Sequence, residues 1–457
     1  MNLPWDAEAL LQMAHRLRGG GYFADLFLEK TLERWFCLLP DGSCQIKQDG
    51  YQGAALRAWT SPLEVRFCAL EGTALRELRA AVEAHRLPGS APLQSDLRII
   101  TVKPATSEEP SEDLIQEALA SLRALVYDAL PQIAHLEATL ILNERHKCIV
   151  HTEGRLIEEY SRSWTARVEV AQRGPRGLMR ALYLNGGIGG PEASWIALPE
   201  EALRCLYQDL ERQREAQTLR SGSYPVLLGP GWTGMFWHEA LGHRVEADVW
   251  SAQDGRPRPG ARIASSAVTL WDWGTLPGGR GSAAFDDEGT PQQQTLLVAE
   301  GELVGLLTDR LWAARLRRSP TGNGRRMNFR HPPLPRMTNT VLAPGPYSAD
   351  SLLEGLEEGL WVLRLGPGGV LPDSAKIWFE VVEAYWVEHG RVRYPLAPFR
   401  LVASSDRLLK GVLAVGNDLH LGAAYGTCLK QGQALPVSAA SPSVLIGAIR
   451  AIAHNPA

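Results

Sequence analysis

The stretch FWHEALGHRVEAD, residues 236–248, places two histidines five residues apart and sets a glutamate directly after the first. Helical zinc sites of the H-E-x-x-H type separate the histidines by four residues instead. On a regular α-helix each residue advances by about 100°, so residues five apart point about 140° away from each other. His238 and His243 therefore reach one metal ion only if the backbone is deformed between them. We predict a π-bulge there, because Gly242 tolerates unusual backbone angles.

Glu239 gives this pattern its chemical interest. A zinc ion held by neutral imidazoles lowers the pKa of bound water. A glutamate beside a ligand is placed to accept the proton of that water and pass it to a leaving amine. A third ligand is still required, and Glu246, Asp248 and a residue distant in sequence are the candidates. Glu246 equally fits a solvated helical carboxylate, and the whole pattern also fits an ordinary packed or solvated helix.

Bulk composition excludes several classes of protein. The chain has 457 residues, enough for two or three domains, with 45% hydrophobic and 21% charged residues and a formal net charge of −4. The absence of a long basic run argues against a dedicated nucleic-acid binder. The first residues carry acidic groups and no long apolar core, and no apolar stretch reaches the ~18 residues of a membrane helix. We expect a cytoplasmic protein without nucleic-acid or membrane partners.

Six cysteines are spread thinly along the chain, which does not indicate a disulfide framework: Cys37, Cys44, Cys68, Cys148, Cys205 and Cys428. Cys37 and Cys44 flank an expected hairpin turn and are interpreted as ordinary thiols. A second metal site at His146, Cys148 and His151 is not expected, because on a strand the first two share a face and the third points away.

The two halves of the chain differ in pattern. The first predicts helices near the start, over 71–87 and over 111–129, a hairpin around the PDGS turn at 40–43, and a strand meander over 135–172. A charged helix over 199–218 follows. From about residue 255 the chain is rich in Gly, Pro and short apolar runs, which favours strands and long loops. We predict an α+β protein with an α/β N-terminal domain (1–198), a linker helix (199–220) and a β-rich catalytic domain (221–457).

Several longer motifs occur in a fixed order in the second half: HEALGHRVEAD (238–248), GTLPGGRGSAAFDDEGTP (274–291), VVEAYWVEHGRVRYPL (381–396) and GTCLKQGQALPVSAASPS (426–443). Together they resemble the TldD/PmbA family of metallopeptidases, and specifically its TldD branch. The PmbA branch, also called TldE, is similar in fold but lacks the H-E-x-x-x-H residues. The resemblance is strong over about 220–445 and implies the α/β domain followed by a β-rich domain.

The resemblance also implies the ligand set. In the family two motif histidines and a cysteine near the C-terminus hold one zinc ion, which here points to His238, His243 and Cys428, with Glu239 as the catalytic base. Two departures lie close to that cysteine. Leu429 stands where the family has glycine, and SAASPS (438–443) replaces a glycine-rich segment.

The function implied is zinc-dependent hydrolysis of short or unfolded peptides, as in leader-peptide trimming or fragment degradation. Extended peptides would bind through backbone hydrogen bonds. Family members dimerise with themselves or as a TldD–TldE pair. The alternative is a non-hydrolytic TldE-like subunit that binds peptide and supports an active protease chain.

A loop over 319–340 gathers basic residues among Gly and Pro: Arg325, Arg326, Arg330, His331 and Arg336. Such arginines can hold a peptide carboxylate or stabilise an oxyanion. They can equally pair with the acidic turn at Asp286, Asp287 and Glu288, for which a structural role is expected.

Overall fold

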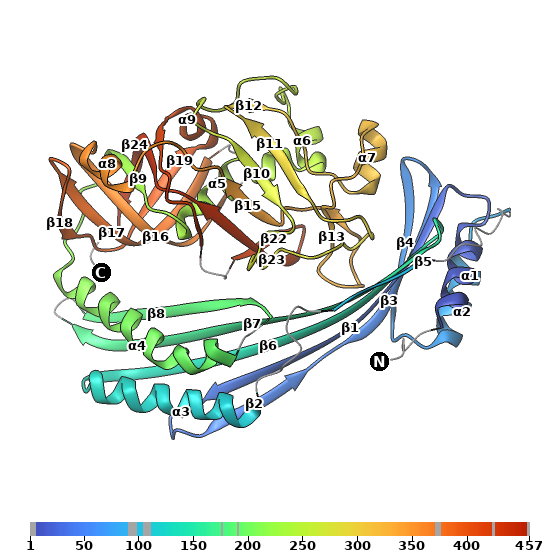
Figure 1. Cartoon of the computed structure of the whole chain (residues 1–457), viewed down its shortest axis with the longest axis horizontal. Coiled ribbons are helices and arrows are strands. Elements are labelled where there is room, and N and C mark those ends of the chain that lie inside the picture. Colours follow the sequence, from blue (N-terminus) through green and yellow to red (C-terminus); the bar gives the residue numbers. More distant parts are fainter. Residues whose placement is uncertain are drawn as a thin grey trace.

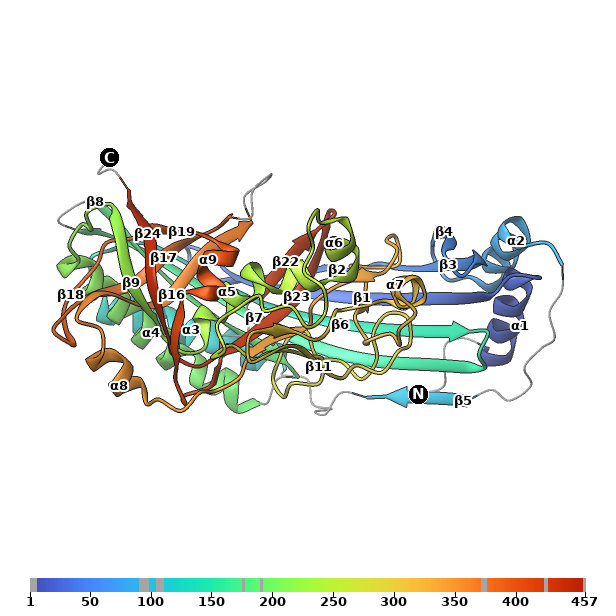
Figure 2. The ribbon, with the colours of Figure 1, turned by 90° about the horizontal axis from the view of Figure 1, so that it is seen from above.

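The computed structural model describes residues 6–89, 98–103, 111–174, 177–189, 192–370, 376–422 and 426–454. The N-terminal half forms a long, curved sheet, and the C-terminal half forms a strand-rich body packed against it (Figure 1). The predicted α+β class is confirmed. Seen from above, the body covers only part of the sheet, and the end that carries the first two helices projects beyond it (Figure 2). Within the described residues no helix is long and apolar enough to cross a membrane.

The curved sheet has the strand order β4-β3-β1-β6-β7-β5, with β2 added to β1 and β8 added to β7. Its pairs are antiparallel except β5 with β7. The strands are β1 (Phe23–Leu38), β2 (Cys44–Asp49), β3 (Gln52–Ser61), β4 (Glu64–Glu71), β5 (Arg98–Val102), β6 (Ile133–His151), β7 (Arg155–Gly174) and β8 (Gly177–Ile188). The predicted hairpin is β1–β2, and the predicted meander is β6–β7.

Four helices cover this sheet in two pairs: α1 (Ala7–Arg18), α2 (Leu75–His85), α3 (Glu112–Ala129) and α4 (Glu192–Glu215). The pairs α1–α2 and α3–α4 lie at opposite ends of the sheet (Figure 1). The helix predicted over 199–218 begins earlier, at Glu192. Leu198, Ala202 and Leu206 of α4 belong to the same buried cluster as Ala166 and Val168 of β7. This helix is therefore a packed layer of the N-terminal half, because its apolar face is matched by the sheet.

One sheet of the C-terminal body closes on itself. Its order is β16-β9-β24-β19-β17-β18, and β17 pairs back onto β16, so five strands form a barrel; β20 also pairs with β24. The strands are β9 (Gly222–Leu228), β16 (Glu358–Val370), β17 (Lys376–Glu388), β18 (Arg391–Pro395), β19 (Phe399–Ser404), β20 (Val412–Val415) and β24 (Val444–Ala453). Two short helices, α8 (Ala349–Glu354) and α9 (Ser405–Lys410), connect them.

The second sheet of the body has the order β12-β11-β10-β15-β23-β21, and β22 forms a hairpin with β23. These strands are β10 (Leu270–Trp273), β11 (Gln294–Ala299), β12 (Glu302–Leu303), β15 (Asn339–Leu342), β21 (His420–Leu421), β22 (Gly426–Lys430) and β23 (Gln433–Ser441). The remaining elements are η1 (Trp232–Gly234), α5 (Met235–Ala240), η2 (Gly242–Val245), α6 (Ala247–Ala252), α7 (Arg310–Leu316), β13 (Gly324–Arg325) and β14 (Leu334–Pro335).

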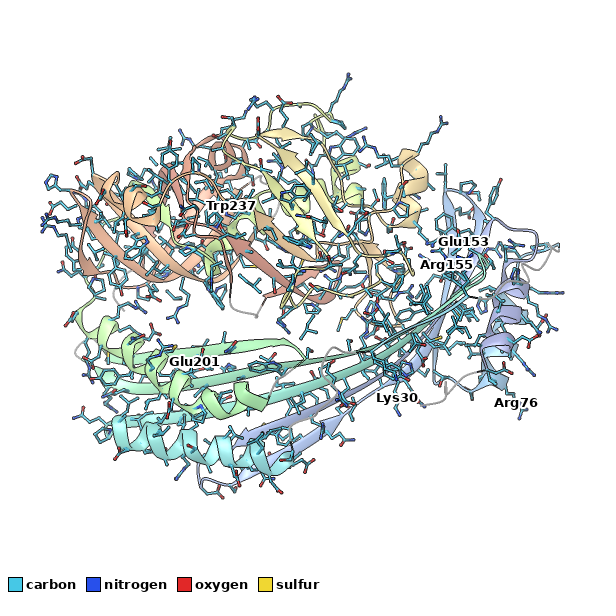
Figure 3. The ribbon with its side chains drawn as sticks, viewed as in Figure 1. Lys30, Arg76, Glu153, Arg155, Glu201 and Trp237 are labelled. Atoms are coloured by element: carbon cyan, nitrogen blue, oxygen red, sulfur yellow. The ribbon has the colours of Figure 1, made fainter. Side chains whose placement is uncertain are left out.

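Helix α5 is buried between the barrel and the second sheet, and it carries the first histidine of the sequence motif. Phe236 stacks on Phe379 of β17 with ring centroids 5.2 Å apart. Trp237 is fully buried in the middle of the body (Figure 3) and donates its indole N–H to Ser441 Oγ of β23 at 3.1 Å. Two large aromatic side chains thus anchor α5 to both sheets.

Buried charges join the two halves. Arg57 of β3 pairs with Asp25 of β1 and with Glu288 of the acidic turn. Lys147 of β6 contacts Asp287 at 3.2 Å, and its ammonium also donates to the backbone oxygen of Phe285 at 2.9 Å. These charged side chains are almost completely inaccessible to water. The acidic turn therefore has the structural role expected of it, as the link between the body and the curved sheet.

We predict that Arg57→Met destabilises the protein by about 3–5 kcal/mol, because it leaves Asp25 and Glu288 buried without their cation. The free energy of unfolding from urea titration measures the effect. Arg330→Met is the control: this arginine pairs with Glu71 at the surface, so its loss costs at most about 1 kcal/mol. Equal losses in the two variants would show that the buried pairs are no more important than a surface pair.

His151, at the end of β6, is fully buried beside the turn that holds Glu153 (Figure 3). Burial and the charge of Arg310 lower the pKa of His151 to about 3, against the opposing charge of Glu153. Because the pKa of His151 is lower in the folded than in the unfolded chain, its contribution to the free energy of unfolding is complete above pH 6.5 and is lost as the pH falls. Between pH 7 and 5 this histidine alone accounts for a loss of about 2 kcal/mol. We predict that His151→Gln removes that part of the acid sensitivity in urea titrations; an unchanged pH dependence would contradict this.

Candidate metal centre

The backbone leaves the helix between the two motif histidines. The N–H of Leu241 makes the last helical bond of α5, to the Trp237 carbonyl at 3.1 Å, and the 3₁₀ helix η2 begins at Gly242. Leu241 itself has φ −128° and ψ −44°, outside the helical region. The predicted π-bulge is therefore wrong: a helix end followed by a 3₁₀ helix replaces it. The reason is that the break at Leu241 redirects the chain, so no extra residue has to be accommodated within a continuing helix.

Gly242 is required by a close approach rather than by its backbone angles. A Cβ atom built on Gly242 would lie 1.9 Å from Sδ of Met337. No side chain fits in that space unless the buried side chain of Met337 moves. The sequence indicated a glycine here because of its backbone freedom. The structure shows that the glycine is needed because a side chain would clash with Met337.

The structure brings together the three predicted ligands. Donor atoms of His238, His243 and Cys428 all lie within 4.8 Å of one another. Nε2 of His243 is 3.4 Å from Sγ of Cys428, and the two imidazole rings meet edge to face at 5.0 Å. Nε2 of His238 is buried and has no hydrogen-bond partner within the described residues. Across the part of the chain that the structure describes, no other group of His, Cys, Asp or Glu is arranged in this way.

The second nitrogen of each imidazole is held by a neighbour. Nδ1 of His238 lies 3.2 Å from Oγ1 of Thr340 on β15, and Nδ1 of His243 lies 3.0 Å from Oε2 of Glu246. Such contacts fix the ring orientation and leave Nε2 of both rings for a metal ion. Glu246 thus lies behind the ring of His243, and Cys428 supplies the third donor atom of the cluster.

Glu246 is fully buried, which excludes a solvated carboxylate. In addition to its contact with the His243 ring, its carboxylate accepts hydrogen bonds from the backbone N–H of Met337 at 3.2 Å and from the ammonium of Lys430 at 2.9 Å. Lys430 also binds Asp248 at 2.7 Å. Sequence reasoning missed Lys430. The available signal was its position two residues after Cys428, which places both on one face of a strand.

Electrostatics within the cluster favour a thiolate. Burial raises the pKa of Cys428, but the two imidazoles outweigh it and lower the pKa to about 4. Burial also opposes the charge on His243, yet Glu246 and Cys428 raise the pKa of this ring well above its usual value. The pKa of Glu246 is lowered to about 2, against its burial, by His243 and Lys430. Thiolate is the form of cysteine that binds metal.

Glu239 follows His238 on α5 and is only partly buried. None of the described residues donates a hydrogen bond to its carboxylate, in contrast to Glu246. The residue after Cys428 also faces solvent: Leu429, which replaces the family's glycine, is 70% exposed. The side chain of Leu429 therefore lies at the surface, outside the cluster that contains Cys428.

The arginine loop supports the cysteine hairpin. Arg336 is fully buried and donates to the backbone oxygens of Cys428 at 2.6 Å and Gln433 at 3.1 Å. Arg325 donates to the backbone oxygen of Pro436 at 2.9 Å. Neither guanidinium forms an ion pair with the acidic turn among the described residues; both bind backbone oxygens instead. Both hold β22 and β23 in place. The sequence had suggested either contact with substrate or pairing with the acidic turn, and this role is neither.

The other members of this loop have partners elsewhere. Arg326 contacts Asp287 through its backbone N–H and lies over the ring of Phe27, 4.2 Å from its centroid. Arg330 pairs with Glu71, and His331 contacts Asn328. Arg326 thus contacts the acidic turn through hydrogen bonds that involve backbone groups, and not through an ion pair among the described residues.

The second histidine cluster forms no metal site among the described residues. Nε2 of His146 lies 2.9 Å from Glu158, and its ring stacks on Tyr160 at 3.8 Å. Cys148 is fully buried, and burial raises the pKa of its thiol. All six cysteines are free thiols, as predicted.

Comparison with known proteins identifies the family to which the chain belongs. Residues 221–452 match the family described as the PmbA/TldA metallopeptidase C-terminal domain. A metalloprotease TldD homolog of Buchnera aphidicola subsp. Acyrthosiphon pisum is 30% identical over 356 residues, covering 74% of this chain and 71% of that protein. A zinc metalloprotease TldD homolog of Saccharolobus solfataricus is 30% identical over 247 residues, covering 54% and 55%.

Among solved structures, TldE from Thermococcus kodakarensis shares the fold, with a TM-score of 0.69 at 16% identity over 94% of this chain and 96% of that one. The family match and the Buchnera relative, which aligns well beyond the C-terminal half, show that the chain belongs to the TldD/PmbA family.

Proposed function

We propose that the chain is a zinc-dependent peptidase, with one zinc ion per chain held by His238, His243 and Cys428. The observation that carries the proposal is the convergence of three donor atoms, one of them the orphaned Nε2 of His238. Two imidazoles and a thiolate suit zinc and are unsuited to magnesium or calcium, which take oxygen ligands. Three protein ligands leave a fourth position open, as in catalytic rather than structural zinc sites.

In this proposal Glu239 is the general base. When bound, zinc supplies a Lewis acid that lowers the pKa of water and polarises a carbonyl. Glu239 accepts the proton of the attacking water and delivers it to the amine that leaves when the peptide C–N bond breaks. Its carboxylate is adjacent to a ligand and is not engaged by the described residues, so it is free for this role.

The proposed substrates are short or unfolded peptides in extended form, as in leader-peptide trimming or fragment degradation. Support comes from the relatives named metalloproteases. An extended peptide would bind mainly through hydrogen bonds of its backbone, with modest side-chain preference.

We extend the proposal to a dimer, formed by two copies or with a TldE-like chain. The alternative function, a non-hydrolytic partner subunit, does not require a converged ligand set with an unengaged glutamate beside it. The intact cluster is the reason to prefer the peptidase.

The first prediction concerns the ligand and the base. Purified wild-type chain should contain about one zinc per chain by plasma mass spectrometry, and Cys428→Ala should lose most of it because thiolate is a strong zinc ligand. Glu239→Gln should keep the zinc and lose about 10²- to 10⁴-fold in hydrolysis of an unfolded peptide, followed by mass spectrometry. Full zinc content in Cys428→Ala would mean that the third ligand is a different residue. A zinc-free wild type, even after metal is offered, would favour the partner subunit.

The second prediction concerns the residue behind His243. Glu246→Gln should weaken zinc binding by about 10- to 100-fold, measured by competition with a chelator, because the ring loses the carboxylate that orients it. Asp248→Asn is the matched control: it also contacts Lys430 but touches neither histidine. Zinc affinity that falls equally in both variants would assign the effect to Lys430 rather than to the contact with His243.

A further inference from the structure

A second site lies on the barrel, apart from the metal centre. Strand β24 pairs with β20 through Val444–Ile446 and with β19 through Arg450–Ala453, and it is irregular between these stretches. A groove of about 830 Å³ opens where β24 changes partner, bordered by β19 and α9. These elements lie together in the part of the body that is far from α1 and α2 (Figures 1 and 2). No metal-centre residue lines the groove.

The groove combines an apolar lining with basic side chains. Val402, Ala403 and Ala448 contribute apolar surface that solvent reaches, and the other large apolar lining residues are almost fully buried. Lys376, Arg407 and Arg450 also line it, and no acidic residue does. Arg407 and Arg450 bring two positive charges to a lining that contains no carboxylate among the described residues, and the resulting positive local potential favours an anionic occupant.

Two of these cations are available to a ligand. Within the described part of the chain, neither Arg407 nor Arg450 forms an ion pair, and both are exposed. The acid nearest in sequence to Arg407, Asp406, is taken by Arg244 at 2.5 Å. The side chains of Ser223 and Ser404 also line the groove, and a hydroxyl can donate to an anion.

We propose that this groove binds a small organic anion with an apolar body, its charged group held by Arg407 and Arg450 and its apolar part lying on Val402, Ala403 and Ala448. The volume lies within the range of small-molecule sites, about 300–1,000 Å³. Planar guanidinium groups bind carboxylate or phosphate through paired hydrogen bonds. The proposal does not depend on peptidase activity or on zinc.

The probe is decanoate, an apolar chain with one carboxylate, titrated into the full-length protein by calorimetry. Wild type should bind it saturably, and 1-decanol, which lacks the charge, should bind at least about tenfold more weakly. Arg407→Gln/Arg450→Gln should raise the Kd by about tenfold or more for the same reason. Arg391→Gln, an exposed arginine of β18 outside the groove, is the matched control and should leave the Kd unchanged.

Two further measurements locate the binding. Ala448→Glu places a negative charge at an exposed position in the groove and should weaken decanoate binding. Amide hydrogen exchange should slow in 404–411 and 446–450 when decanoate is added. Non-saturable binding, equal Kd values for the double variant and the control, or protection confined to other segments would overturn the proposal. Preference for vesicles of anionic phospholipid over dissolved decanoate would assign the groove to a lipid surface instead and would also overturn it.

Discussion

The carboxylate of Glu246 holds together three segments that are distant in sequence. It accepts hydrogen bonds from the ring of His243, the backbone of Met337 and the ammonium of Lys430. A fully buried charge costs several kcal/mol of desolvation, so it is stable only when its oxygens are well supplied with donors. Meeting that requirement orients one ligand histidine and fixes β22, which carries Cys428. The orientation of His243 and the position of the strand that carries Cys428 thus depend on the same buried charge.

The same constraint operates between the two halves of the chain. Glu288 and Asp287 enter the interface as buried carboxylates, and the curved sheet supplies Arg57, Arg145 and Lys147 as their partners. Removing one partner leaves the other charge uncompensated, so the interface tolerates little rearrangement. The two halves are therefore joined by buried charges that water does not reach, so each charge depends on its partner across the interface. This explains why an acidic turn occurs in the middle of a β-rich body.

Local patterns in the sequence predicted the local structure well. Apolar periodicity located α1 and α3, because each buries one face against its own half, and the PDGS turn located the β1–β2 hairpin. Cys428 as a metal ligand came only from the family resemblance, since nothing near the histidines indicates a residue almost two hundred positions away. Lys430 and the cations that meet the acidic turn were not predicted. Their positions depend on pairing between distant strands, which spacing along the chain does not encode.

The break at Leu241 shows why the backbone around the histidines was predicted incorrectly. Spacing showed that a regular helix fails, but the form of the deformation is decided by what packs against it. Sδ of Met337 occupies the place where a Cβ of Gly242 would stand, and the N–H of the same Met337 binds Glu246. A larger side chain at Gly242 would clash with the buried side chain of Met337, the residue whose backbone N–H binds Glu246. Gly242 and Glu246 are thus linked through Met337: its side chain lies against the glycine, and its backbone N–H binds the carboxylate.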